Sequence, residues 1–266
     1  MLGVNRHTAR DAIYGELGRM PLLPEILGIM FKYWHRIKNL PDTYRNKLLL
    51  GSLDIRENHL TGMICNKWLH TLKYVLSKCE LEDTWNNGTV RITKFIKLLN
   101  AKLKGTFTAE WQQRINSDDK RKNGQHNKLR TYRTFKQSFV REPYLAITRP
   151  QIRRSVAQLR VSAHKLEIER GRHVPFSHRL PPEQRTCKYC TSNAMEDEIH
   201  FLITCPFYHN LRAHLFNAII KYFPSFSNLT TEHKFIWLMS NEDEYVISVC
   251  SQFIYNAFQK RSNSEH

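Results

Sequence analysis

The sequence has few acidic residues and no long uncharged apolar run. Its 24 Asp and Glu stand against 41 Lys and Arg, which gives a formal net charge of +17. A surplus of this size favours polyanionic partners such as nucleic acid or an anionic membrane surface. The longest apolar stretches are short and contain charges, as Leu22 to Trp34 is interrupted by Glu25 and Lys32. We therefore expect no membrane-spanning segment, and of the two polyanionic partners we expect nucleic acid and no membrane.

The first residues do not have the pattern of a secretory signal. Arg6, Arg10 and Asp11 precede any apolar run, so we expect no signal peptide there. The sequence therefore predicts an intracellular protein in a reducing compartment. In such a compartment the six cysteines are expected to be free core thiols or metal ligands before disulfides are considered.

Catalytic motifs are also missing. The sequence has no Gly-x4-Gly-Lys phosphate loop, no His-Glu-x2-His helix and no Gly-x-Ser-x-Gly elbow. Asp118 and Asp119 resemble the paired carboxylates of a polymerase, but they lie in NSDDKRKN without a preceding strand to hold them rigidly. We expect a protein with no catalytic activity of its own.

The apolar residues that are present follow a helical period, and no stretch alternates for long at period two. The sequence therefore predicts a mainly α fold, with a helical bundle over residues 1–117. Three segments of this bundle each have one expected apolar face. These faces comprise Leu23, Ile26, Met30, Trp34 and Ile37; Ile64, Trp68, Leu72, Val75 and Cys79; and Ile92, Phe95, Ile96, Leu99 and Leu103.

A polar stretch separates this bundle from the rest of the chain. Residues 116–128, NSDDKRKNGQHNK, contain no apolar side chain. We expect a basic polar linker over residues 118–128. Beyond it, residues 129–266 are predicted to form a basic helical segment, a small zinc knuckle at residues 187–205 and C-terminal helices.

Two prolines mark helix starts in the second region. Pro150 suits the first position of a helix, and Pro206 is expected to start another. Asn241 with Glu244 is predicted to cap the last helix. The helix from Pro150 has an apolar seam of Ile152, Val156, Leu159 and Ala163.

Most of the positive charge lies in one segment. Residues 120–172 contain 15 basic and three acidic side chains, a net of +12. We expect these cations to contact phosphate, because the segment has too few carboxylates of its own to neutralise them. The residues predicted to bind nucleic acid are Lys128, Arg130, Arg133, Arg149, Arg153, Arg154, Arg160, Arg170 and Arg172. Tyr132 and Phe135 offer rings for stacking on bases, but we favour core packing for both.

Four residues have the spacing of a metal site. Cys187 and Cys190 form a Cys-x2-Cys pair, and His200 and Cys205 follow after nine and four residues. Three thiolates and one imidazole are the ligands that one tetrahedral Zn²⁺ prefers. Because all four positions come from protein, none remains for water, and the predicted zinc is structural.

Two alternatives to this assignment remain. The cysteines can instead be scattered core thiols, as we expect for Cys65, Cys79 and Cys250. A different histidine can also take the fourth position. The candidates are His173, His178 and His209.

These motifs resemble the region downstream of the reverse transcriptase domain in LINE-type (non-long-terminal-repeat) retrotransposon polyproteins, especially those of invertebrates. The resemblance lies in CKYC followed by MEDEIHFLITCPFYHNLR, and upstream in LRTYRTFK, RRSVAQLRVSAHKLEIERGRH and LGVNRHTARDAIYGELGRMPL. It implies a zinc-binding accessory region that binds the RNA of the retrotransposon or its target DNA beside a polymerase. It also implies a nuclear location. The polymerase and endonuclease regions are not in this chain, so the resemblance implies a truncated or partial gene product.

Three functions follow as hypotheses. The first is a non-catalytic, zinc-stabilised module that binds RNA or DNA, with a reverse transcriptase domain as a further expected partner. The second is a zinc-stabilised protein-interaction module, in which an exposed apolar patch on the first bundle binds a partner and the charge serves solubility. The third is an enzyme fragment that works only with a separate polymerase chain.

Overall fold

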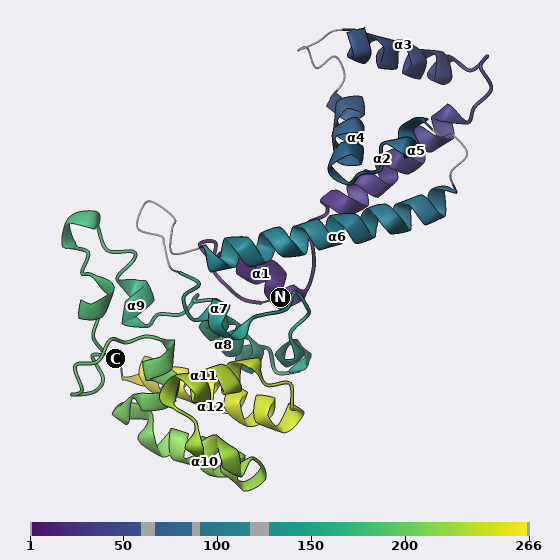
Figure 1. Ribbon diagram of the computed structural model, residues 1–266. Coiled ribbons are helices and arrows are strands. Elements are labelled where there is room, and N and C mark those ends of the chain that lie inside the picture. The colour runs from purple at the N-terminus through teal and green to yellow at the C-terminus, as the bar shows by residue number, and fades with distance from the viewer. Residues whose placement is uncertain (1, 60–66, 87–90, 118–127, 265–266) are drawn as a thin grey trace. The chain divides into compact units, whose positions relative to one another are not determined.

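The computed structural model describes residues 2–59, 67–86, 91–117 and 128–264 (Figure 1). The predicted linker therefore lies outside the described residues except for Lys128, and so does Cys65. The α-helices are α1 (Arg10–Leu17), α2 (Leu23–Lys38), α3 (Arg45–His59), α4 (Lys67–Lys78), α5 (Asp83–Asn86), α6 (Ile92–Asn116), α7 (Tyr132–Phe135), α8 (Pro150–Arg160), α9 (Glu167–Arg170), α10 (His209–Tyr222), α11 (Thr231–Ser240) and α12 (Glu244–Asn263).

Short irregular helical turns connect several of these helices. They are η2 (Pro143–Ala146), η3 (Phe176–His178), η4 (Pro182–Gln184), η5 (His200–Thr204), η6 (Pro206–Tyr208) and η7 (Pro224–Asn228). Within the described ranges, β-pairing consists of two isolated bridges, Leu17 with Arg141 and Thr186 with Met195. The prediction of a mainly α fold is confirmed. None of the described helices has the length and apolarity needed to cross a bilayer.

The chain forms two compact units, and their bounds differ from the division predicted at residues 118–128. Unit 1 comprises Met1–Arg19 and Trp111–His266, and unit 2 comprises Met20–Glu110. The first residues thus pack with the C-terminal region and not with the bundle that follows them. Trp111 Nε1 donates a hydrogen bond to the Asp11 carbonyl at 2.8 Å. Contacts between residues so far apart in sequence cannot be predicted from the local spacing of apolar residues.

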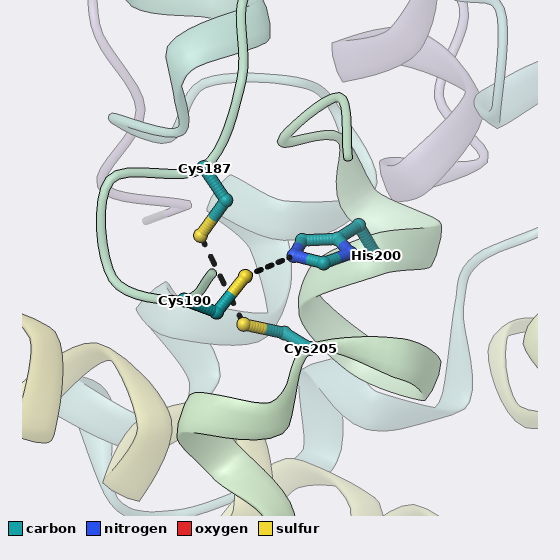
Figure 2. Close-up of side chains that lie close together, drawn as sticks. All are labelled: Cys187, Cys190, His200 and Cys205. Atoms are coloured by element: carbon teal, nitrogen blue, oxygen red, sulfur yellow. Dashed lines mark hydrogen bonds between the residues drawn. The ribbon is translucent and has the colours of Figure 1, made fainter. Parts of the chain in front are cut away.

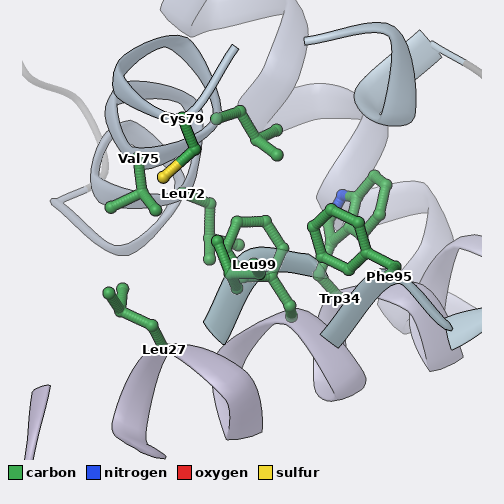
Figure 3. Close-up of a cluster of buried hydrophobic side chains, with 9 residues drawn as sticks. Leu27, Trp34, Leu72, Val75, Cys79, Phe95 and Leu99 are labelled. Carbon is green, nitrogen blue, oxygen red and sulfur yellow. The ribbon is translucent and has the colours of Figure 1, made fainter. Parts of the chain in front are cut away.

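Unit 2 is built around one apolar cluster (Figure 3). The cluster joins α2, α4 and the first turns of α6 through Leu27, Phe31, Trp34, Leu72, Val75, Leu76, Cys79, Phe95 and Leu99. Phe31 and Phe95 meet edge to face, with ring centroids 5.1 Å apart. The faces predicted for α4 and α6 are confirmed at every described position, because each of those residues is buried in or packed against this cluster.

The face predicted for α2 was only partly right. Trp34 and Ile37 are buried as expected, but Leu23 and Ile26 are 57% and 49% exposed. Leu27 and Phe31 are buried in their place. Apolar residues occupy two sides of this helix, so periodicity alone selected the wrong side near its start.

Unit 1 contains the remaining helices. α12 packs against α8 and α10, and α11 packs against α7. α8 begins at Pro150 as predicted, and Ile152, Val156 and Leu159 are buried. Tyr132 and Phe135 are also buried, which confirms that they are core residues.

The cap of α12 differs from the prediction. Asp243 is the N-cap, and its carboxylate accepts hydrogen bonds from the backbone of Tyr245 and Val246. Asn241 instead accepts from the backbone N–H of Asp243 at 2.9 Å. Asp243 stands directly before the first helical residue, which is the position that an N-cap carboxylate requires.

Candidate metal centre

Cys187 and Cys190 lie on a turn that is closed by backbone hydrogen bonds. The Cys187 N–H donates to the Ala194 carbonyl, and the Glu196 N–H donates to the Arg185 carbonyl, both at 2.9 Å. Asn193 has a left-handed backbone (φ 52°), which lets the chain reverse direction there. The turn therefore brings both thiols to the same side, toward the segment that follows.

His200 and Cys205 lie at the two ends of the π-helical turn η5. The Asp197 carboxylate accepts from the His200 N–H at 2.7 Å and holds the start of this turn. The Cys205 N–H donates to the His200 carbonyl at 2.8 Å. Phe201 and Leu202 between them are buried. The wider π turn thus brings an imidazole and a thiol to one side while apolar residues anchor the segment.

The four predicted ligands converge (Figure 2). Their ligand atoms all lie within 4.8 Å of one another. The sulfurs of Cys187 and Cys205 are 3.9 Å apart, and Cys190 Sγ lies 3.5 Å from His200 Nε2. These four residues form a cluster that can hold one metal ion. The other histidines considered from the sequence, His173, His178 and His209, do not belong to it.

Hydrogen bonds around the cluster orient its ligands. His200 Nδ1 lies 3.0 Å from the Thr204 hydroxyl, which leaves Nε2 facing the sulfurs. Arg212, which is buried, donates to the Cys205 carbonyl at 2.7 Å and to the Leu202 carbonyl at 3.0 Å. Outer contacts of this kind fix the ring and backbone that present metal ligands.

Hydrogen bonds that share protons within the cluster shift the pKa of three of its four ligands. A hydrogen bond with Cys205, and then burial, raise the pKa of Cys187 to about 12. The same hydrogen bond lowers the pKa of Cys205. Burial lowers the pKa of His200, but hydrogen bonds with Cys187 and Cys190 outweigh it and raise the pKa overall. Because metals bind thiolates, an ion entering the cluster displaces these protons.

The other described cysteines belong to the two cores. Cys79 lies in the apolar cluster of unit 2. Cys250 in α12 is 3% exposed, and burial raises its pKa to about 12. Both are core thiols, as the sequence predicted.

A buried carboxylate joins the cluster to α12. Cys187 Sγ donates to Glu196 Oε1 at 3.5 Å. Glu196 in turn pairs with both terminal nitrogens of Arg261. The Arg261 guanidinium also lies 4.3 Å from the centre of the Tyr189 ring, in the turn between the first two cysteines. The end of α12 therefore contacts both the turn and its acidic flank.

A second buried carboxylate, Glu198, stands two residues before His200 and joins this part of the chain to the segment after α8. Its oxygens accept from Arg130, from His164 Nε2 at 2.9 Å and from the Ser162 hydroxyl at 2.9 Å. Burial alone raises the pKa of Glu198, but Arg130 and His164 outweigh it and hold the pKa far below its usual range. Sequence reasoning missed Glu196 and Glu198 as ion-pair partners; the acidic run MEDE was the available signal.

Three of the cations predicted to contact phosphate are internal ion-pair partners. Arg160 is 4% exposed and pairs with Glu16 and Glu142. Arg130 pairs with Glu169 and Glu198, and Arg172 pairs with Glu169. The prediction is corrected for these residues, because carboxylates neutralise them: those of Arg130 and Arg160 are distant in sequence, and that of Arg172 is three residues away.

The other six predicted cations differ in how freely they face solvent. Arg149 and Arg154 are exposed. Arg170 is exposed and lies 3.5 Å from Glu167. The remaining three are half-buried and donate to backbone carbonyls: Lys128 to His7, Arg133 to Asn116 and Arg153 to Ile147.

Comparisons with protein-family models, with curated proteins and with solved structures found no match. Function is therefore inferred from the geometry of the cluster and from the charges around it.

Proposed function

We propose that the chain is a non-catalytic nucleic-acid-binding module stabilised by one structural Zn²⁺, of the kind found downstream of the reverse transcriptase domain in LINE-type retrotransposons. The observation that carries the proposal is the convergence of Cys187, Cys190, His200 and Cys205. A nuclear location and a reverse transcriptase partner belong to the same proposal.

The distances support zinc as the metal. Tetrahedral bonds of about 2.3 Å to sulfur separate two sulfurs by about 3.8 Å, and a bond of about 2.0 Å to nitrogen places it about 3.5 Å from sulfur. The corresponding separations here are 3.9 Å for Cys187 with Cys205 and 3.5 Å for Cys190 with His200. These two pairs already have tetrahedral separations, and the other pairs, which lie within 4.8 Å, need to shorten by at most about 1 Å to seat the ion.

The ligand set supports a structural and not a catalytic ion. Four protein ligands fill a tetrahedral shell, so no position is left for an activated water. What the ion supplies is a crosslink between the turn of Cys187 and Cys190 and the turn η5. Through Glu196 and Arg261 this crosslink extends to α12.

Charge supports nucleic acid as the partner. The chain carries a net charge of +17. Of the cations predicted to bind phosphate, Arg149 at the N-cap of α8 and Arg154 within α8 are exposed and are not among the internal ion pairs. Cations of this kind bind phosphates with release of counterions, which makes the affinity fall steeply with salt.

Metal analysis of the purified protein tests the zinc part of the proposal. We expect about one equivalent of Zn²⁺ in the wild type and less than half an equivalent in Cys190→Ser, because one thiolate is lost. Ser192→Ala is the matched control, since its hydroxyl lies 3.1 Å from Cys190 Sγ but is no ligand. A wild type with less than about half an equivalent would contradict the proposal.

A second candidate function is supported by one feature of unit 2. Leu22, Ile26, Ile29 and Tyr33 form an exposed stripe along α2, with Ile29 at 67% exposure. Exposed apolar stripes mark protein-binding surfaces more often than single exposed residues do. The protein-interaction function predicts no retention of single-stranded RNA at 0.1 M salt, whereas the nucleic-acid function predicts retention that declines with salt.

A further inference from the structure

A cavity of about 410 Å³ lies beside the contact between α8 and α12 in unit 1. Its size falls within the range of small-ligand sites. The walls come from α8, from the turn that follows it and from the last turns of α12. The lining residues that matter are Arg154, Gln158, Lys165, Tyr255 and Phe258.

A second cavity of about 350 Å³ adjoins the first. It lies against the N-terminal segment at Gly3 and Asn5 and extends to Arg170. Gln158 and Lys165 line both cavities, and we refer to these two neighbouring cavities together as the groove. Among the residues that the structure describes, no carboxylate lines either part.

Two cations of this groove have no carboxylate partner among the described residues. Arg261 is paired with Glu196, and His164 donates to Glu198. Arg154 and Lys165, in contrast, are exposed and form no ion pair in the described ranges. Their charge is therefore available to an anionic ligand.

The close approach of Gly3 positions one of these cations. Gln158 Nε2 donates to the Gly3 carbonyl at 3.1 Å, which ties the N-terminal segment to α8. Gly3 has a left-handed backbone (φ +66°), and a Cβ there would lie 2.3 Å from Arg154 Nε. The segment thus lies directly against the Arg154 side chain and limits where it can go.

Two aromatic side chains supply flat apolar surface next to these cations. Phe258 is stacked on the buried Phe201, with centroids 4.7 Å apart and an interplanar angle of 25°. Tyr255 lies one turn earlier on α12, and both are half-buried where they line the groove. Cations next to aromatic rings are the combination by which proteins bind unpaired nucleotides.

We propose that this groove binds one nucleotide of an unpaired strand, with its phosphate on Arg154 and Lys165 and its base against Tyr255 and Phe258. The inference rests on the proposed nucleic-acid function and assigns it a site. A free nucleotide shares this chemistry, and the experiment separates it from a strand.

Fluorescence anisotropy of the full-length, zinc-loaded chain with a labelled 12-nucleotide single-stranded RNA tests the groove. At 0.1 M salt, Arg154→Gln/Lys165→Gln is expected to weaken binding about 25-fold and to reduce the salt slope by about 1.4, because two phosphate contacts are lost. The control Arg141→Gln/Lys221→Gln removes two exposed cations of unit 1 that do not line the groove. It is expected to change affinity by less than about threefold.

Tyr255→Leu tests the stacking contact without changing charge. We expect a loss of at least about fivefold for the single strand with an unchanged salt slope. The corresponding duplex and free AMP are the other two probes. Both are expected to bind the wild type more weakly than the single strand, because a paired base cannot reach the rings and AMP offers no flanking phosphates.

The outcomes separate the groove from the proposed function. If the wild type binds the strand with a steep salt dependence and the groove variant binds as well as the control variant, the groove is not the binding site. The proposed nucleic-acid function is then unaffected. A wild type that binds no strand at 0.1 M salt overturns the proposed function itself. Equal binding of AMP would assign the groove to a free nucleotide, and equal binding of the duplex would refute the stacking contact. Unchanged melting temperature and zinc content show that each variant is folded.

Discussion

The two units of the chain are stabilised by different kinds of contact. In unit 2 the helices meet through apolar side chains, and the ion pairs described there, Lys47 with Asp42 and Lys102 with Glu80, are exposed. In unit 1 the buried contacts include several ion pairs and the cysteine–histidine cluster. The buried pairs join Arg160 to Glu16, Arg261 to Glu196 and Arg130 to Glu198.

This difference changes how each unit should respond to a single substitution. A buried charge that loses its partner keeps its desolvation cost, so the destabilisation exceeds the net value of the pair. An apolar core loses contact area roughly in proportion to the atoms removed. Unit 1 should therefore depend on its buried charges and on the proposed metal ion, and unit 2 on apolar packing.

Loss of the proposed Zn²⁺ should separate the two units most strongly. Chelation, or Cys205→Ser, removes a crosslink whose binding free energy is about 10 kcal/mol in isolated zinc peptides, so we expect unit 1 to lose more than about 5 kcal/mol. Hydrogen exchange measured peptide by peptide is the test. Residues 187–212 should lose protection, while the peptide around Phe31 keeps it.

The exchange experiment contains its own control, because both units are present in one molecule. Equal loss of protection in the two units would show that zinc stabilises the whole chain. The proposed difference between a metal-dependent unit 1 and a packing-dependent unit 2 would then be wrong. Unchanged protection at residues 187–212 would show that the cluster contributes nothing to stability.

Arg160→Met should have the next largest effect. It leaves Glu16, which is fully buried, without its partner, and we expect unit 1 to lose about 3–5 kcal/mol in urea unfolding. The double variant Arg160→Met/Glu16→Gln should recover part of this loss, because the unpaired charge is gone. A single variant that costs less than about 1 kcal/mol would mean that the pair is effectively solvated. RNA binding by the folded fraction should stay unchanged.

Local features explain what could be predicted from the sequence. The spacing of Cys187, Cys190, His200 and Cys205 spans 19 residues, and its ligand chemistry is specific enough to predict the cluster. The apolar faces of α4 and α6 were also predicted, because the exposed sides of these helices are mostly polar. In α2 two sides are apolar, and which side is buried depends on helices elsewhere in the chain.

The ion pairs could not be predicted, because their partners are distant in sequence. Arg160 and Glu16 are 144 residues apart, and Arg130 and Glu198 are 68 residues apart. Counting charges within residues 120–172 therefore overstated how many cations remain for phosphate. The division into units could not be predicted for the same reason. α1 packs with residues far away in sequence: the Tyr132 hydroxyl donates to the carbonyl of Ala12, 120 positions earlier.

A smaller effect, confined to unit 2, sharpens the comparison. Leu72→Ala removes a fully buried side chain from the apolar cluster, and we expect unit 2 to lose about 3 kcal/mol because a cavity remains. Lys102→Ala breaks only an exposed pair and should cost less than about 0.5 kcal/mol. Urea unfolding followed by exchange of the α4 peptide measures both, with and without chelator. Since unit 2 contains no described ligand of the cluster, neither value should change when zinc is removed. A Leu72→Ala cost that doubles on chelation would mean that the two units share stability, and the contrast between a metal-dependent and a packing-dependent unit would fail.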